Sequence, residues 1–196
     1  ANAALLSFDD GYLDHYNYVL PELLSRNISG SFYVPASVVR DRALLSVNKI
    51  HLLLATLENV SILVEAIDKA VNEAFHVGVK DIRSTPAYRD EHMKSSRLDS
   101  AEVIYVKRML QHALPEQFRE ELLDKLMKEF VSSDLKALAE DFYVSEDNLV
   151  EMRGAGMHIG GHGDRHLWLN RCNPHQRDSE IAASRALLDA IGVQED

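Results

Sequence analysis

Residues 3–35 read AALLSFDDGYLDHYNYVLPELLSRNISGSFYVP, and this stretch decides the fold. Residues 3–8 are mostly apolar and uncharged, which predicts a short buried strand, and residues 31–34 predict a second strand. Between them, residues 12–25 have the apolar spacing of a helix, in which Pro21 starts a new turn or a kink. Strand, helix and strand in this order form a βαβ unit, so we expect an α/β fold with a parallel sheet.

The rest of the chain has a helical middle and then returns to the α/β pattern. From about residue 43 to 141, Gly and Pro are rare and apolar residues recur at helical spacing, which predicts amphipathic helices. Residues 80–97 are polar and contain a proline, so we expect a loop there. Ser145 predicts the N-cap of a short helix, residues 157–159 a strand and residues 174–191 a further helix.

Length and composition limit the possible functions. The 196 residues can bury a core, and the 21 Lys and Arg against 31 Asp and Glu give a net charge of −10. Because so acidic a chain repels phosphate backbones, we expect no nucleic-acid partner. The single cysteine, Cys172, excludes an internal disulfide.

The sequence also bears on membranes and export. No stretch approaches the roughly 18 apolar residues that span a bilayer, so we expect no transmembrane segment. The first eight residues lack the basic region of a signal peptide and lead directly into a polar motif. This leaves the localisation open and favours the cytoplasm.

Two adjacent carboxylates, Asp9 and Asp10, follow the first expected strand and precede a Gly turn. In parallel α/β folds, sites are built at this end of the sheet. Side chains alternate along an extended backbone, so one carboxylate can bind a metal while the other handles a proton. The alternative is a turn stabilised by an Asp side chain and without any site.

Two histidines, His162 and His166, follow the later expected strand at a spacing of four residues. At this spacing they can grip one cation, although a chain with nine histidines can contain such a pair by coincidence. Combined with Asp10, they leave coordination positions open, as a catalytic metal site requires. With Asp9 accepting a proton from water, such a site would hydrolyse an amide or an ester.

These motifs and their flanks resemble the polysaccharide deacetylase family (the NodB homology domain, carbohydrate esterase family 4). The resemblance is carried by LSFDDGY at 6–12 and HGDRH at 162–166, with flanks LPELL at 20–24, SFYVP at 31–35, GMHIGGH at 156–162 and residues 180–188. It covers about residues 4–39 and 145–192. It implies a distorted (β/α) barrel that removes acetyl groups from N-acetylated or O-acetylated sugars of a polysaccharide or its precursor.

The resemblance implies a role for four residues. Asp9 corresponds to the catalytic base, and Asp10, His162 and His166 correspond to the ligands of a divalent metal, usually zinc. The residue types also suit cobalt, nickel, manganese or iron. Substrate-binding residues and the oligomeric state are not assigned.

The chain departs from the family pattern in three ways. Gly163 stands where the family has Ser or Thr. The long stretch between the motifs implies a helical insertion at 43–144 within one domain, 1–196. The later motifs are missing, so we expect a barrel that lacks its C-terminal strands and a chain that is incomplete. Two alternatives stay open: a hydrolase of a formamide or other small amide on the same scaffold, and a non-catalytic module that binds metal or sugar.

Overall fold

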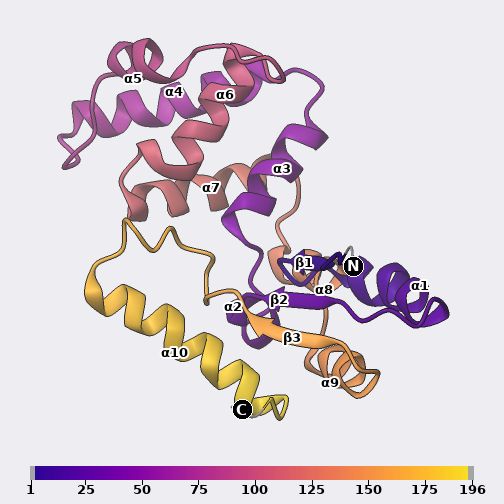
Figure 1. Cartoon of the computed structure of the whole chain (residues 1–196). Helices are drawn as coiled ribbons and strands as arrows, with labels where there is room; N and C mark the ends of the chain where they lie inside the picture. Colours follow the sequence, from indigo (N-terminus) through magenta and orange to yellow (C-terminus); the bar gives the residue numbers. More distant parts are fainter. Residues whose placement is uncertain (1–2, 194–196) are drawn as a thin grey trace. The chain divides into compact units, whose positions relative to one another are not determined.

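A computed structural model describes residues 3–193 of the chain, which form two compact units (Figure 1). The first unit, here called the sheet unit, contains the described residues up to Leu45 and from Lys136 onward. The second, the helical unit, spans Ser46–Leu135.

The sheet unit is built on three parallel strands in the order β1-β2-β3 (Figure 1). The strands are β1 (Ser7–Asp9), β2 (Ser31–Val34) and β3 (His158–Gly161). The expected α/β class with a parallel sheet is therefore confirmed. The three strands form an open sheet, and the structure does not show the barrel that the resemblance implies.

Strand β1 is shorter and more exposed than its sequence predicts. It starts at Ser7 rather than at residue 3, and Leu5, just before it, is 80% exposed. The prediction of a buried strand over residues 3–8 is wrong, because β1 lies at an edge of the sheet and has only β2 as its neighbour. Hydrophobic sequence alone does not distinguish an edge strand from a central one.

In its described residues the sheet unit contains five α-helices and one π-helix. They are the π-helix η1 (His15–Val19), α1 (Leu20–Ser25), α2 (Ala36–Arg40), α8 (Leu135–Phe142), α9 (Glu146–Gly154) and α10 (Pro174–Ala190). Pro21 is the second residue of α1, which follows directly on η1, so the winding of the helix changes from π to α just before the proline. Ser145 caps α9 as predicted, and Asn173 caps α10 in the same way, each in a reciprocal capping box. Both α9 and α10 pack against β3.

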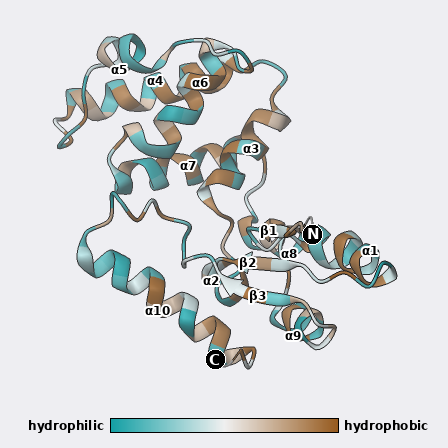
Figure 2. Ribbon diagram, viewed as in Figure 1, coloured by the Kyte–Doolittle hydropathy of each residue, from teal (hydrophilic) through white to brown (hydrophobic). Residues whose placement is uncertain are grey.

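The helical unit consists of amphipathic helices around an apolar core. They are α3 (Ser46–Thr56), α4 (Ser61–His76), α5 (Thr85–His92), α6 (Ala101–Arg108), the π-helix η2 (Met109–Ala113) and α7 (Glu116–Phe130). Fully buried side chains from different helices meet in the core, among them Ile50, Leu63, Tyr105 and Leu123. Figure 2 shows apolar and polar residues alternating along these helices, as the sequence periodicity predicts.

One sequence prediction fails in this unit. Residues 80–97 were expected to form a loop, but α5 occupies Thr85–His92. The proline that suggested a loop, Pro86, lies in the first turn of α5, where proline favours the start of a helix.

The helices expected between residues 43 and 144 thus fall into two groups. Helices α3 to α7 form the helical unit, whereas α8 lies almost wholly within the sheet unit. That the helical unit is an insertion into one domain stays a prediction. Within residues 3–193, no helix is both long enough and apolar enough to cross a bilayer.

Candidate metal centre

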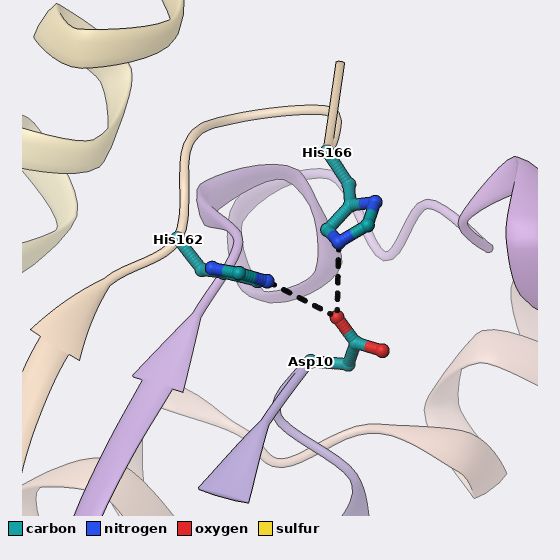
Figure 3. Close-up of side chains that lie close together, drawn as sticks. All are labelled: Asp10, His162 and His166. Carbon is teal, nitrogen blue, oxygen red and sulfur yellow. Dashed lines mark ion pairs between the residues drawn. The ribbon is translucent and has the colours of Figure 1, made fainter. Parts of the chain in front are cut away.

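Asp10, His162 and His166 come together at the carboxyl edge of the sheet (Figure 3). Asp10 directly follows β1, and His162 directly follows β3. The Nε2 atoms of His162 and His166 each lie 3.6 Å from Asp10 Oδ1. One ligand atom from each side chain lies within 4.8 Å of the other two. Within residues 3–193, no other three His, Cys, Asp or Glu side chains gather in this way.

The spacing and chemistry of these atoms suit a divalent cation. Atoms bound to one tetrahedral zinc ion at the usual bond lengths lie about 3.3–3.4 Å apart, close to the distances seen here. Asp10 Oδ1 is buried and has no hydrogen-bond partner. Because burying a carboxylate oxygen without a hydrogen bond is unfavourable, this atom fits a ligand to an ion between the two imidazoles.

Two of the three side chains come from unusual backbone conformations. The φ angles of Asp10 and His166 are 71° and 58°, in the left-handed region that residues other than Gly rarely adopt. Such conformations persist only where the surrounding structure holds them, and they cluster at functional sites. The surroundings of both residues therefore matter for the geometry of the triad.

The turn after β1 fixes Asp10. The Tyr12 hydroxyl donates to Asp10 Oδ2 over 3.3 Å, which leaves Oδ1 directed at the histidines. Gly11, with φ 68°, packs so closely on Val34 that a Cβ would lie 2.7 Å from Val34 Cγ1. The Gly11 carbonyl also accepts a hydrogen bond of 2.9 Å from Val144 N. A side chain at position 11 would displace this turn.

The exit from β3 fixes His162. A Cβ on Gly160 would lie 2.6 Å from the Tyr33 ring, and one on Gly161 would collide with Ser184 of α10. The two glycines thus allow the close packing that their sequence position suggests. His162 N then donates to the carbonyl of Val34 over 3.1 Å, which ties the start of the loop to β2.

Asp9, the expected base, is the last residue of β1 and is exposed. It is not part of the Asp10, His162 and His166 group. Its register partner is Tyr33 on β2. The two adjacent carboxylates are therefore used differently, since one closes a group of three ligand atoms and the other faces solvent.

Three aromatic or histidine side chains near the site are not part of the triad. The His15 ring packs against Phe8, Tyr12 and Phe32, and burial lowers the pKa of its imidazole, although Asp10, Asp14 and Asp9 act in the opposite direction. His158 is exposed and lies against Tyr33. Trp168 is 48% exposed, with the Arg171 guanidinium 4.8 Å from its ring centre.

Sequence reasoning missed two residues that support the triad. Tyr12 stands two residues after Asp10, where a nearby hydroxyl could have been noticed. Glu180 lies on α10 and accepts hydrogen bonds from the loop between the histidines, and no spacing rule in the sequence indicates this. A comparison with protein-family models, curated proteins and solved structures found no match.

Proposed function

We propose that Asp10, His162 and His166 bind one divalent metal ion, zinc, in a hydrolase that removes acetyl groups from acetylated sugars. The observation that carries the proposal is the buried Asp10 Oδ1, which has no hydrogen-bond partner and lies 3.6 Å from both Nε2 atoms. One carboxylate and two imidazoles leave coordination positions open for water and substrate.

The residues divide the chemistry between them. A bound divalent ion supplies a Lewis acid that acidifies water and polarises a carbonyl group. Asp10, His162 and His166 hold that ion, and Tyr12 orients the Asp10 carboxylate. The exposed Asp9 carboxylate takes the proton from the attacking water in this proposal. We propose acetylated sugars as substrates, and a distorted barrel completed by further strands, because residues 6–12 and 162–166 resemble the motifs of polysaccharide deacetylases.

Metal binding and hydrolysis are tested with separate variants. We expect the chain to bind about one zinc per molecule, and Asp10→Ala to abolish this binding, as measured by metal analysis after gel filtration. Asp9→Ala should retain zinc but reduce acetate release from N-acetylglucosamine oligomers by roughly 10²- to 10⁴-fold. Unchanged acetate release after chelation would refute the metal-dependent mechanism. Zinc binding without any acetate release, in a protein that includes the further strands, would favour a non-catalytic module.

A further inference from the structure

The loop that carries His162 and His166 is held on two sides. On one side, the first residues of α2 donate to its carbonyls: Ala36 N to Gly163 O over 2.9 Å, and Ser37 N to Asp164 O over 3.1 Å. The Ser37 hydroxyl adds a bond of 2.6 Å to the same Asp164 oxygen. The carbonyl groups of the loop are thereby fixed to the segment that follows β2.

On the other side, one carboxylate receives the N–H groups of the loop. Asp164 N donates to Glu180 Oε2 over 2.9 Å, and Arg165 N lies 3.2 Å and 3.1 Å from Glu180 Oε1 and Oε2. Glu180 is only 3% exposed. Hydrogen bonds to a charged acceptor are stronger than neutral ones, so this carboxylate is well suited to hold two consecutive backbone amides.

Gly163 shows how closely the loop and the carboxylate fit. A Cβ at position 163 would lie 2.8 Å from Glu180 Oε2, and the φ angle of Gly163 is 75°. Glu180 thus fills the space into which a side chain at position 163 would project. The backbone between the two histidines therefore follows a path that fits the carboxylate of Glu180.

We propose that Glu180 is a positioning residue of the metal centre, which holds the backbone of Asp164 and Arg165 so that His162 and His166 present their Nε2 atoms to one ion. The inference rests on the proposed metal binding. His166 adopts a left-handed conformation that is unfavourable on its own, and the fixed amide of the preceding residue maintains it. Residues that orient ligands in this way raise metal affinity because the site is formed before the ion arrives.

The test compares Glu180→Gln with Asp178→Asn in the full chain. Both variants replace a carboxylate of α10 by its amide, but Asp178 is exposed. We expect Glu180→Gln to weaken zinc binding by about 10- to 100-fold, measured by competition with a chromophoric chelator, and to alter the absorption bands of bound Co²⁺. In the metal-free protein, the amides of Asp164 and Arg165 should exchange with solvent faster. Asp178→Asn should match the wild type in all three measurements.

Each outcome decides the inference. A folded Glu180→Gln protein with wild-type zinc affinity and an unchanged Co²⁺ spectrum overturns it, while the proposed metal site stands. A wild-type chain that binds no zinc overturns the proposed function and this inference together. If circular dichroism shows that Glu180→Gln does not fold, Glu180→Asp replaces it. This variant keeps the charge but withdraws the oxygens by one methylene, so the same loss of affinity is expected.

Discussion

Asp68 in the helical unit and Asp10 in the sheet unit are carboxylates of similar burial, with 12% and 18% of their side chains exposed. Their oxygens are used differently. Asp68 Oδ1 accepts from the Tyr105 hydroxyl over 2.6 Å, and Asp68 Oδ2 accepts from Arg89 Nε over 2.8 Å and from Arg89 Nη2. Asp10 has the Tyr12 hydroxyl on Oδ2, but its Oδ1 is buried without a hydrogen-bond partner.

The same difference extends to the two units. Among the described residues, three buried side-chain atoms have no hydrogen-bond partner, and all belong to the sheet unit: Asp10 Oδ1, His15 Nδ1 and Asp164 Oδ1. Asp164 Oδ1 still forms an ion pair of 3.2 Å with Arg40. Folded proteins contain few buried polar atoms without a hydrogen bond. Departures from such rules occur chiefly at functional sites. Among the described residues, the helical unit thus satisfies its buried polar side chains, whereas the sheet unit leaves three such atoms without a hydrogen bond, one of them in the candidate metal centre.

The largest effect on stability is expected from Asp68→Asn. The amide of Asn lacks the negative charge of the carboxylate that accepts hydrogen bonds from Arg89. It also has only one oxygen to accept from both Arg89 and the buried Tyr105 hydroxyl. Because the Arg89 side chain is 45% exposed and can turn to water, we expect a loss of about 2 kcal/mol rather than the full cost of a broken buried pair. Urea unfolding of the metal-free chain measures it. A loss below about 0.5 kcal/mol would contradict the view that this network stabilises the helical unit.

The same substitution at Asp10 is expected to have a smaller effect of a different kind. Asp10→Asn removes a charge whose buried oxygen has no hydrogen bond, and Asn tolerates a left-handed backbone as Asp does. We expect the stability of the metal-free chain to change by less than about 1 kcal/mol, with an increase favoured. Added zinc, which should stabilise the wild type, should no longer stabilise the variant. A loss as large as that of Asp68→Asn would show that Asp10 serves the fold.

The smallest effect concerns His15 and pH. Burial holds the pKa of His15 below 6.5 in the folded chain, so the unfolded chain takes up a proton first as the pH falls. The neutral ring therefore contributes stability that is present above about pH 6.5 and is lost as the pH falls toward the folded-state pKa. The free energy of unfolding can be measured with urea at several pH values between about 7.5 and 5, the range in which His titrates. It should depend less steeply on pH for His15→Gln than for the wild type.

The exposed His51 of α3 provides the control for this measurement. His51→Gln should retain the pH dependence of the wild type. Equal slopes for His15→Gln and the wild type would mean that the half-buried ring of His15 contributes nothing to the pH dependence of folding.

Short-range signals in the sequence predicted much of the sheet unit. Apolar segments that end in polar motifs predicted the strands. They also predicted that Asp10, His162 and His166 lie at the same edge of the sheet. Ser145 gave the start of α9, because a capping residue acts over three positions of the same chain. Such signals suffice where the interaction that fixes the structure is local.

Long-range relations were not predictable in the same way. The exposure of Leu5 depends on which strand lies at the edge of the sheet. Glu180 accepts hydrogen bonds from backbone amides 15 and 16 residues earlier in the chain. Every residue type except proline has such an amide, so the sequence does not indicate these bonds. Sequence motifs therefore identified the candidate ligands but not what holds them in place.

Glu180 holds the loop between His162 and His166 through backbone groups, and this affects which substitutions the loop tolerates. Glu180 grips the amide of Arg165, whereas the Arg165 side chain itself is exposed, one residue before His166. Any amino acid other than proline has the same backbone N–H, so the residue at position 165 can be replaced without loss of the hydrogen bond to Glu180. A saturation library at position 165 therefore explores new side chains beside the candidate metal centre while the backbone that carries its histidines stays constant.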